Sequence, residues 1–288
     1  MQLNYFMKQM KLRNLYIVLF AIILSSCGEY NKILKSTDND LKYTYAKKYF
    51  QDGKYTQAIT LLQDLVPIYK GTSKAEESLY MLAQSYYNTK DYLSATEMFT
   101  TYYSTYPNGQ FAENALFYAA YGMYLDSPDL RLDQSKTFKA IASFSRYMEE
   151  YPDSERTEQA RKYLFELQEK LAYKELLNAK SYLRLGNYMG NNYESAVVVS
   201  KEALKSYPYS KYAEEFQMTI LRARYEFAKR SKIELQPERF RTVVDEFYNY
   251  KNTYPTGKYI KEAEKYYNDA QRKIKSFAPN AATNVQTK

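Results

Sequence analysis

Two hydrophobic patterns divide the chain. Residues 15–24 form an unbroken apolar run of ten, whereas from about residue 41 apolar residues return every three or four positions between polar and charged ones. The second pattern is typical of amphipathic helices, each with one face for a core. No stretch alternates apolar and polar residues over the length of a strand. We therefore predict an all-α fold with almost no strand.

The unbroken run belongs to a leader segment. It follows the basic residues Lys8, Lys11 and Arg13 with no acidic residue before it, and two serines come directly after it. Ten apolar residues are too few for a hydrocarbon layer that requires about 20. A basic segment, a short apolar core and small residues before a cleavage point are typical of a secretory signal. We predict that residues 1–26 are a cleaved signal peptide and that the protein is exported.

The helical part repeats a local pattern five times. A small apolar residue stands eleven positions before a tyrosine, usually with an aromatic residue three positions before it, and another small residue follows the tyrosine by three. In the last four copies a proline comes directly after the tyrosine. Agreement at several offsets indicates internal repeats. The pairs of small residue and tyrosine are Ala58 and Tyr69, Ala95 and Tyr106, Ala140 and Tyr151, Ala196 and Tyr207, and Val243 and Tyr254.

Each copy has the features of a helix pair. The small residue lets two helices approach closely, and the tyrosine with its proline ends the second helix because proline cannot continue it. The Ser, Thr or Asx residue that follows can cap the next helix. One pair cannot bury its apolar face alone, so the pairs must stack. The pattern resembles the tetratricopeptide repeat, which implies a right-handed α-solenoid of about five helix pairs plus a C-terminal capping helix.

The spacing of the copies sets the expected boundaries. Successive small residues are 37, 45, 56 and 47 positions apart, compared with about 34 in the tetratricopeptide repeat. An insert at 126–129, a long polar helix over about 155–185 and a longer turn near 231–237 account for the excess. We predict a tether over 27–40, repeats one to three over 41–154, repeats four and five with the capping helix over 155–277, and a disordered tail over 278–288.

A single cysteine follows the leader. Cys27 comes directly after Leu24-Ser25-Ser26 and is the only cysteine in the chain. A leucine three positions before a cysteine, with small residues between, resembles the bacterial lipobox. The resemblance implies that Cys27 becomes the N-terminus, receives an S-diacylglycerol and an N-acyl group, and anchors the protein to a membrane. The alternative is a plain signal peptide in which this cysteine has no special role. No other cofactor is expected.

Composition argues against several kinds of chemistry. The chain has no histidine, so the usual general base and the commonest metal ligand are missing. We expect neither catalysis nor a metal site. The mature chain holds 38 basic residues, which is 41 minus the three of the leader, against 33 acidic ones. Most of this excess lies in 257–288, where seven basic residues accompany three acidic ones and could meet acidic lipid head groups or an acidic protein face. An exported chain does not meet the genome, so nucleic acid is not an expected partner.

Aromatic residues mark one face of the first three helix pairs. Ala46, Ala83 and Ala120 occupy one small position, with an aromatic residue three positions before and four positions after each. Residues seven apart share a helix face, and at these offsets tetratricopeptide repeats line their concave surface. We predict a peptide-binding groove, with Lys47 and Asn114 among its hydrogen-bonding residues. The alternative is that the rings only pack between repeats. The predicted groove residues are Tyr43, Phe50, Tyr80, Tyr87, Phe117, Tyr121 and Tyr124.

The order of these elements resembles the BamD family of outer-membrane lipoproteins. The resemblance runs from Cys27 to about Lys275 and includes the lipobox, the repeats with Tyr-Pro-Asn-Gly and Tyr-Pro-Asp-Ser turns, and the insert in repeat three. It implies a non-enzymatic scaffold on the periplasmic face of the outer membrane. The implied partners are a BamA-like β-barrel insertase, unfolded outer-membrane proteins and other lipoproteins of the β-barrel assembly (BAM) machinery. The tyrosine richness and the start Cys27-Gly28-Glu29-Tyr30 resemble the Bacteroidetes branch.

Two other classes of protein stay open. Another periplasmic tetratricopeptide adaptor lipoprotein in cell-envelope assembly would share the leader, the repeats and the lack of catalytic residues. A glycan-binding lipoprotein of the SusD type also contains such repeats. Those proteins are much longer and usually bind glycans with tryptophan, which this chain lacks.

Overall fold

The chain folds into helices throughout the part that the computed structural model describes, residues 29–283. No strand occurs within that range, which confirms the predicted all-α fold. The predicted signal peptide and Cys27 lie outside the described residues, as do residues 284–288 of the predicted tail. A short helical segment over 29–34 comes first. The helices that follow are α2 (Asn39–Gln51), α3 (Tyr55–Ile68), α4 (Ala75–Asn88), α5 (Tyr92–Thr105), α6 (Ala112–Leu125), α7 (Ser135–Glu150), α8 (Thr157–Leu185), α9 (Asn192–Ser206), α10 (Ala213–Lys229), the 3₁₀ helix η1 (Ile233–Leu235), α11 (Gln236–Thr253) and α12 (Ile260–Thr283).

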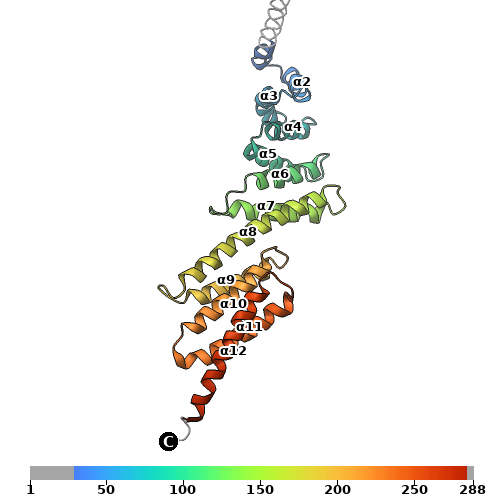
Figure 1. The fold of residues 1–288 in the computed structure, drawn as a ribbon. Coiled ribbons are helices and arrows are strands. Elements are labelled where there is room, and N and C mark those ends of the chain that lie inside the picture. Colours follow the sequence, from blue (N-terminus) through green and yellow to red (C-terminus); the bar gives the residue numbers. More distant parts are fainter. Residues whose placement is uncertain (1–28, 284–288) are drawn as a thin grey trace, which may run out of the picture. The chain divides into compact units, whose positions relative to one another are not determined.

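These helices form the five expected pairs, α2–α3, α4–α5, α6–α7, α8–α9 and α10–α11, followed by α12 as the last helix (Figure 1). The long helix expected over about 155–185 is α8. The C-terminal helix continues to Thr283, past the predicted end at 277.

The chain divides into two compact units. Unit 1 contains the chain up to Ser127 together with Ser135–Arg161, and unit 2 combines Pro128–Gln134 with the chain from Lys162 onward. The N-terminal turn of α8 therefore belongs to unit 1 and the rest of that helix to unit 2. The division lies seven residues beyond the predicted boundary after residue 154, and the insert before α7 belongs to the second unit.

The repeat residues occupy the positions that the sequence predicts. The five small residues of the second helices are completely buried, and so are Ala46, Ala83 and Ala120 of the first helices. The repeat tyrosine stands at the C-terminal end of its helix, for example Tyr106 after α5 and Tyr207 after α9. Close approach at the alanines brings the two helices of a pair together, and the tyrosine marks where the chain turns back.

The helix N-termini differ from the predicted capping. Ser154 and Ser210 accept a backbone N–H two residues further on, at 3.1 and 3.2 Å, within the turn that precedes each helix. Side-chain caps occur instead at helices that follow tight turns, where Asp38, Asp91 and Asn191 accept amides of the first turn of α2, α5 and α9. The small residue after the repeat tyrosine thus stabilises the turn, whereas the helices that follow it at α4, α6 and α10 begin without a side-chain cap.

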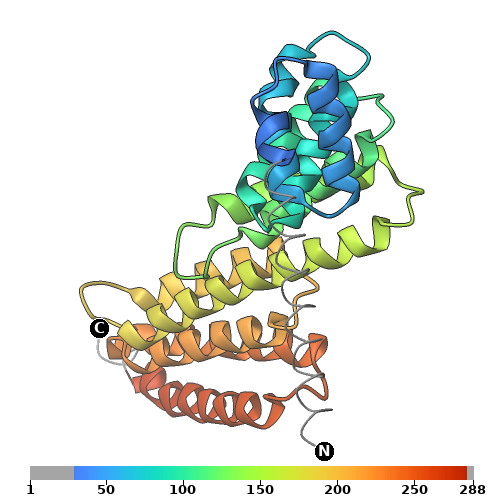
Figure 2. The same cartoon turned by 90° about the horizontal axis from the view of Figure 1, so that it is seen from above.

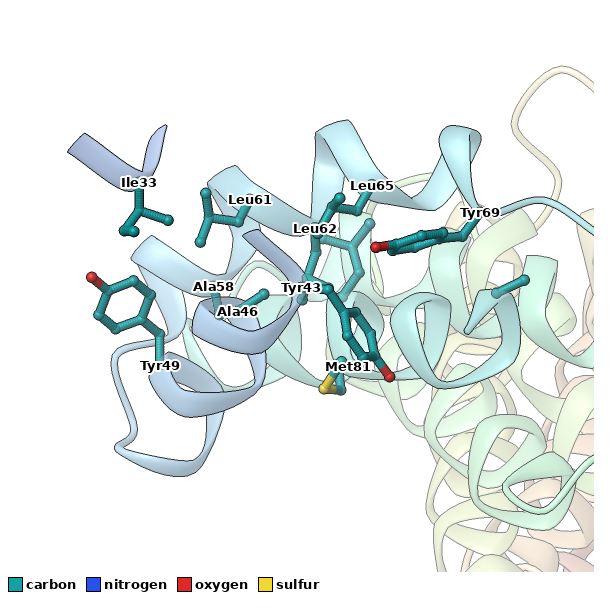
Figure 3. Packing of buried hydrophobic residues seen from close by; sticks show 12 residues of the cluster. Ile33, Tyr43, Ala46, Tyr49, Ala58, Leu61, Leu62, Leu65, Tyr69 and Met81 are labelled. Atoms are coloured by element: carbon teal, nitrogen blue, oxygen red, sulfur yellow. The ribbon is translucent and has the colours of Figure 1, made fainter. Parts of the chain in front are cut away.

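Part of the predicted tether packs against the first repeat. Ile33 is only 4% exposed and lies in the core cluster of α2 and α3 (Figure 3). Tyr30 meets Tyr49 edge-on at 5.8 Å between ring centroids, and the Tyr45 hydroxyl donates to Glu29 at 2.7 Å. The prediction of a simple tether over 27–40 was therefore wrong for 29–34. The apolar residues at positions 30, 33 and 34 have helical spacing and give this segment a face to bury.

A buried tyrosine joins three of the helix pairs to the turn that follows. In the second pair Tyr102 of α5 is completely buried, and its hydroxyl donates to Oε1 of Glu76 on α4 at 2.5 Å. The same hydroxyl accepts the backbone N–H of Phe111 at 3.0 Å, and Glu76 Oε1 accepts that of Gln110 at 2.7 Å. A Cβ on Gly109 would lie 2.5 Å from Glu76 Oε1 and 2.7 Å from the Tyr102 hydroxyl oxygen. We call this arrangement a tyrosine clasp.

The tyrosine clasp recurs in the third and fifth pairs. Its tyrosine, glutamate and small residue are Tyr147, Glu113 and Ser154 in the third pair, and Tyr250, Glu214 and Gly257 in the fifth. The serine of the third pair adds its own hydroxyl, 2.7 Å from that of the tyrosine and 2.5 Å from the glutamate. In the first and fourth pairs Leu65 and Ala203 occupy the position of the clasp tyrosine. Each clasp links two helices of one pair to the start of the next helix.

The clasp tyrosines should ionise only as the helices unfold. Burial, followed by the hydrogen bond to the glutamate, raises the pKa of Tyr102 and of Tyr250 well above the ordinary value of 10.0. A raised pKa in the folded state means that stability is retained below the unfolded pKa and falls as the pH rises beyond it. We expect an alkaline titration to show a late fraction of tyrosinate absorbance that rises together with the loss of helical circular dichroism. A titration completed while the helices remain intact would contradict the clasp.

Candidate peptide-binding surface

The seven predicted groove residues all lie in unit 1, on the first helices of the first three pairs. All seven lie on the first helix of a pair, but their environments differ. Some rings are buried between helices, and others are partly exposed. By helix they are Tyr43 and Phe50 on α2, Tyr80 and Tyr87 on α4, and Phe117, Tyr121 and Tyr124 on α6.

Two of the seven rings are part of the core. Tyr43 is 9% exposed, meets Tyr69 edge-on at 5.6 Å and donates its hydroxyl to Glu77. Phe117 is 4% exposed and meets Tyr147 edge-on at 5.3 Å. The packing alternative accounts for both residues, because neither presents a ring face to solvent.

Phe50 and Tyr80 are partly buried and supported by neighbouring rings. Phe50 meets Tyr55 edge-on at 5.9 Å, close to the turn between α2 and α3. Tyr80 stacks face to face on Phe111 at 4.1 Å with an interplanar angle of 11°. Burial raises the pKa of Tyr80 to about 12. Both residues contribute to packing as well as to the surface.

The rings of α6 form a ladder. Tyr121 lies nearly parallel to Phe117, with an interplanar angle of 14° at 6.3 Å, and Tyr124 nearly parallel to Tyr121, with 13° at 5.8 Å. Phe117 is buried at one end of the ladder, whereas the two tyrosines are partly exposed. Ring pairs at this separation lie within the range in which aromatic side chains attract one another.

Tyr87 and Tyr118 connect the ladder to α4. The ring of Tyr87 lies 4.9 Å from that of Tyr118 and 6.2 Å from that of Tyr121. Tyr118 is a surface ring that the sequence pattern missed, because it does not occupy a repeat offset; the density of aromatic residues in α6 was the available signal. We call five partly exposed rings of α4 and α6 the aromatic surface, and they are Tyr80, Tyr87, Tyr118, Tyr121 and Tyr124.

A cation beside this surface was also missed. The Arg156 guanidinium lies 5.3 Å from the ring centroid of Phe117 and 5.6 Å from that of Tyr118, and it donates a hydrogen bond to the side-chain oxygen of Asn114. Asn114 is one of the predicted hydrogen-bonding residues, and in the structure its side-chain oxygen accepts this hydrogen bond from Arg156. A guanidinium over aromatic rings combines a cation–π contact with a positive charge next to an apolar surface.

The polar residues around α2 are paired with one another. Lys47, another predicted hydrogen-bonding residue, forms an ion pair with Glu77 at 2.7 Å. Burial alone would raise the pKa of the Glu77 carboxyl, but the hydrogen bonds from Lys47 and Tyr43 bring that pKa below its ordinary value. Glu77 is therefore held ionised between its two donors, which ties α2 to α4.

A cavity in the described part of unit 1 lies away from these rings. A cavity of about 270 Å³ opens between α5, α6 and α7, with Tyr103, Met123 and Arg146 in its wall. None of the seven predicted residues lines it. The aromatic surface is thus a set of ring faces and edges outside this cavity.

The described residues hold neither a metal-ligand cluster nor a membrane-spanning helix. Within residues 29–283 no group of three or more His, Cys, Asp or Glu side chains is placed to hold a metal ion. No helix in the same range combines the length and apolar character needed to span a bilayer. Cys27, the predicted lipidation site, is not among the residues described.

The fold and this surface define a helical-repeat protein of the tetratricopeptide type with an aromatic face in its N-terminal unit. The family model described as YfiO, outer membrane lipoprotein, matches residues 35–198. The chain therefore belongs to this family of outer membrane lipoproteins. The match contains all five rings of the aromatic surface and ends within α9.

Two relatives are outer membrane protein assembly factors. The chain is 25% identical to BamD of Pasteurella multocida over 59% of its own length and 68% of that protein. It is 22% identical to BamD of Caulobacter vibrioides over 59% of its own length and 57% of that protein. Among solved structures, the apo form of RapI covers 91% of this chain and 96% of its own at 15% identity, with a TM-score of 0.33, too low to bear on fold or function.

Proposed function

We propose that this chain is an assembly factor of the BAM machinery, acting at the outer membrane as a non-enzymatic scaffold. The observation that supports the proposal most is membership of the YfiO family over 35–198, together with two relatives named as assembly factors. The partners we propose are a BamA-like β-barrel insertase and unfolded outer-membrane proteins, with other lipoproteins of the machinery beside them.

The proposed anchor is a lipid on Cys27. Its position directly after Leu24-Ser25-Ser26 supports S-diacylglycerol and N-acyl attachment there. The described part of the fold then starts only two residues later, at Glu29, and the segment 29–34 packs against the first repeat. Such an anchor would keep unit 1 close to the periplasmic face of the outer membrane, where clients arrive.

The aromatic surface is the proposed client site. Unfolded β-barrel strands alternate apolar and aromatic side chains with polar ones. An aromatic client residue can extend the ladder of Phe117, Tyr121 and Tyr124, and each such ring contact contributes roughly 0.5–1.5 kcal/mol beyond its buried area. Tyrosine also keeps a hydroxyl that can hydrogen-bond the client backbone. Contacts of this size give weak, reversible binding, which suits a protein that passes its client on.

Co-purification tests the proposed role. Membranes from cells that express the full chain with a C-terminal affinity tag would be solubilised gently in detergent, and the bound proteins identified by mass spectrometry. We expect recovery of a BamA-like insertase. A Cys27→Ala variant should be lost from the membrane fraction but keep its helical circular dichroism, because the anchor lies outside the fold. Recovery of a different envelope partner without the insertase would favour the adaptor alternative and overturn the proposal.

A further inference from the structure

One end of unit 2 exposes large apolar side chains on two turns. At the end of α8 Leu185 is 47% exposed, and in the α8–α9 turn Tyr188 and Met189 are 68% and 91% exposed. In the α10–α11 turn Ile233 and Leu235 are 65% and 43% exposed. Isolated exposed apolar residues are ordinary, whereas five together at one end of a compact unit call for an explanation. We call these five residues the apolar tip.

The two turns lie at the same end of the unit. Successive helices run in opposite directions, so α8 and α10 both finish where α9 and α11 begin. The ring of Tyr193, just after the first turn, lies 6.4 Å from that of Phe227, just before the second. Arg224 of α10 and Glu194 of α9 form an ion pair at 2.5 Å. Figures 1 and 2 show the two turns on the same side of the helices in both views.

The α8–α9 turn has a defined conformation. The backbone N–H of Asn192 donates to the Gly186 carbonyl at 2.9 Å, and the Asn192 side chain donates to the Tyr188 carbonyl at 2.7 Å. Met189 has a φ of 53°, a conformation that side-chain-bearing residues other than Asn, Asp and His seldom adopt. A methionine therefore stands at the most exposed point of the turn although the backbone there favours glycine or asparagine.

Basic side chains surround the apolar tip. Arg184, Lys229 and Lys232 are exposed in or beside the two turns. Of the neighbouring acidic residues, Glu226 is paired with Arg230 at 3.1 Å, and Glu234 is exposed. The C-terminal part of α12 adds more positive charge, because α12 follows α11 after a short turn and runs back toward the end where α11 begins, with Lys273 and Lys275 exposed there. The net charge around the tip is positive.

We propose that the apolar tip of unit 2 inserts into the interfacial layer of an anionic phospholipid membrane. Apolar side chains that project from basic surroundings match a membrane interface, where the apolar groups enter the acyl boundary and the cations pair with lipid phosphates. Met189 is 91% exposed, whereas a peptide partner is normally held in a groove. The inference goes beyond the proposed function, since neither client binding nor insertase binding requires a second membrane contact.

Fluorescence of a single introduced tryptophan tests the contact. The chain has no tryptophan, so Tyr188→Trp creates a unique reporter at the tip. Tyr209→Trp is the matched control, because Tyr209 is 89% exposed in the α9–α10 turn at the opposite end of the same unit. Each full-length variant would be mixed with phosphatidylcholine vesicles, with or without phosphatidylglycerol. A local reporter is needed because the N-terminal region has its own predicted membrane attachment.

The proposal requires that the tryptophan emission at position 188 shifts to the blue and is quenched by brominated lipid, with anionic vesicles only. The emission of the tryptophan at position 209 should not change. Added salt should reduce the response, because it screens the cations from the phosphates. Water-like emission at 188 with every vesicle would overturn the proposal, as would equal shifts at 188 and 209 or with and without phosphatidylglycerol. A shift at 188 that occurs only with native envelope membranes and not with pure lipid would assign the tip to a protein partner instead.

A second variant separates insertion from folding. Asparagine tolerates the positive φ of position 189, so Tyr188→Ser with Met189→Asn removes the apolar groups without straining the turn. Ile233→Trp serves as the reporter, with and without these two substitutions. The two substitutions should raise the vesicle concentration that gives a half-maximal emission shift by about tenfold or more. An unchanged half-maximal concentration would show that these side chains do not insert.

Discussion

Replacing Gly109 by alanine is expected to destabilise unit 1 by about 2 kcal/mol. Gly109 has no positive φ, and a Gly→Ala change in a compatible turn ordinarily stabilises by about 0.4–1 kcal/mol through the unfolded chain. Here the new Cβ would lie 2.7 Å from the Tyr102 hydroxyl oxygen. That oxygen is at the end of a completely buried ring and cannot withdraw as a flexible carboxylate can. The sign of the change in the free energy of unfolding, measured with denaturant, therefore shows whether the clasp forms.

A double-mutant cycle provides the control for this experiment. Tyr102→Phe alone should also destabilise, by about 2–3 kcal/mol, because the Glu76 carboxylate and the Phe111 amide each lose a partner. In the double variant the missing hydroxyl leaves room for the alanine Cβ. The two losses should therefore sum to more than the loss in the double variant, by about 1 kcal/mol or more. Strict additivity, or a stabilising Gly109→Ala, would show that the clasp does not form as described.

Tyr121→Ala combined with Tyr124→Ala is expected to weaken the binding of an aromatic-containing β-barrel peptide by about tenfold or more. Two ring contacts at roughly 0.5–1.5 kcal/mol each, plus their apolar area, give a loss of this size. This pair is a cleaner probe than one that includes Tyr80, because Tyr80 stacks on Phe111 at 4.1 Å and supports the fold. Anisotropy of a labelled peptide measures the affinity, and circular dichroism checks the helices.

The matched control for that pair removes exposed apolar side chains elsewhere in unit 1. Leu93 of α5 and Phe138 of α7 are 63% and 56% exposed and do not belong to the aromatic surface. Leu93→Ala with Phe138→Ala should leave the peptide affinity unchanged. If the two double variants lose the same affinity, or if neither loses any, the rings of α6 serve packing alone and the client site lies elsewhere.

The helix pairs could be predicted because their signals are local in sequence. The tyrosine–proline step ends a helix wherever it occurs, and the small residue eleven positions earlier marks the contact between helices. The tyrosine clasp could not be predicted in the same way, since it depends on which glutamate of the preceding helix lies next to Tyr102 or Tyr250. A second tyrosine four positions before the repeat tyrosine was visible in the sequence, but its partner was not.

The candidate site shows the same limit. Tyr43 and Tyr80 hold the same offset in successive repeats, so the pattern assigns them one role. Their environments differ because Tyr43 faces Tyr69 and Glu77, which enclose it, whereas Tyr80 lies under Phe111, at the edge of the next pair. The segment 29–34 was misjudged because proximity to a lipid site suggested a tether, although its own apolar spacing indicates a packed helix.

The distribution of the clasps makes the repeat array uneven along its length. In a repeat protein stability is a sum of terms for each repeat and for each junction between neighbours. The junction after α5, the one after α7 and the one after α11 carry a clasp, whereas that between α9 and α10 has Ala203 where the tyrosine would stand. The junction between α9 and α10 therefore depends on apolar packing around Ala203 and Phe216, which share one buried cluster, and not on a clasp.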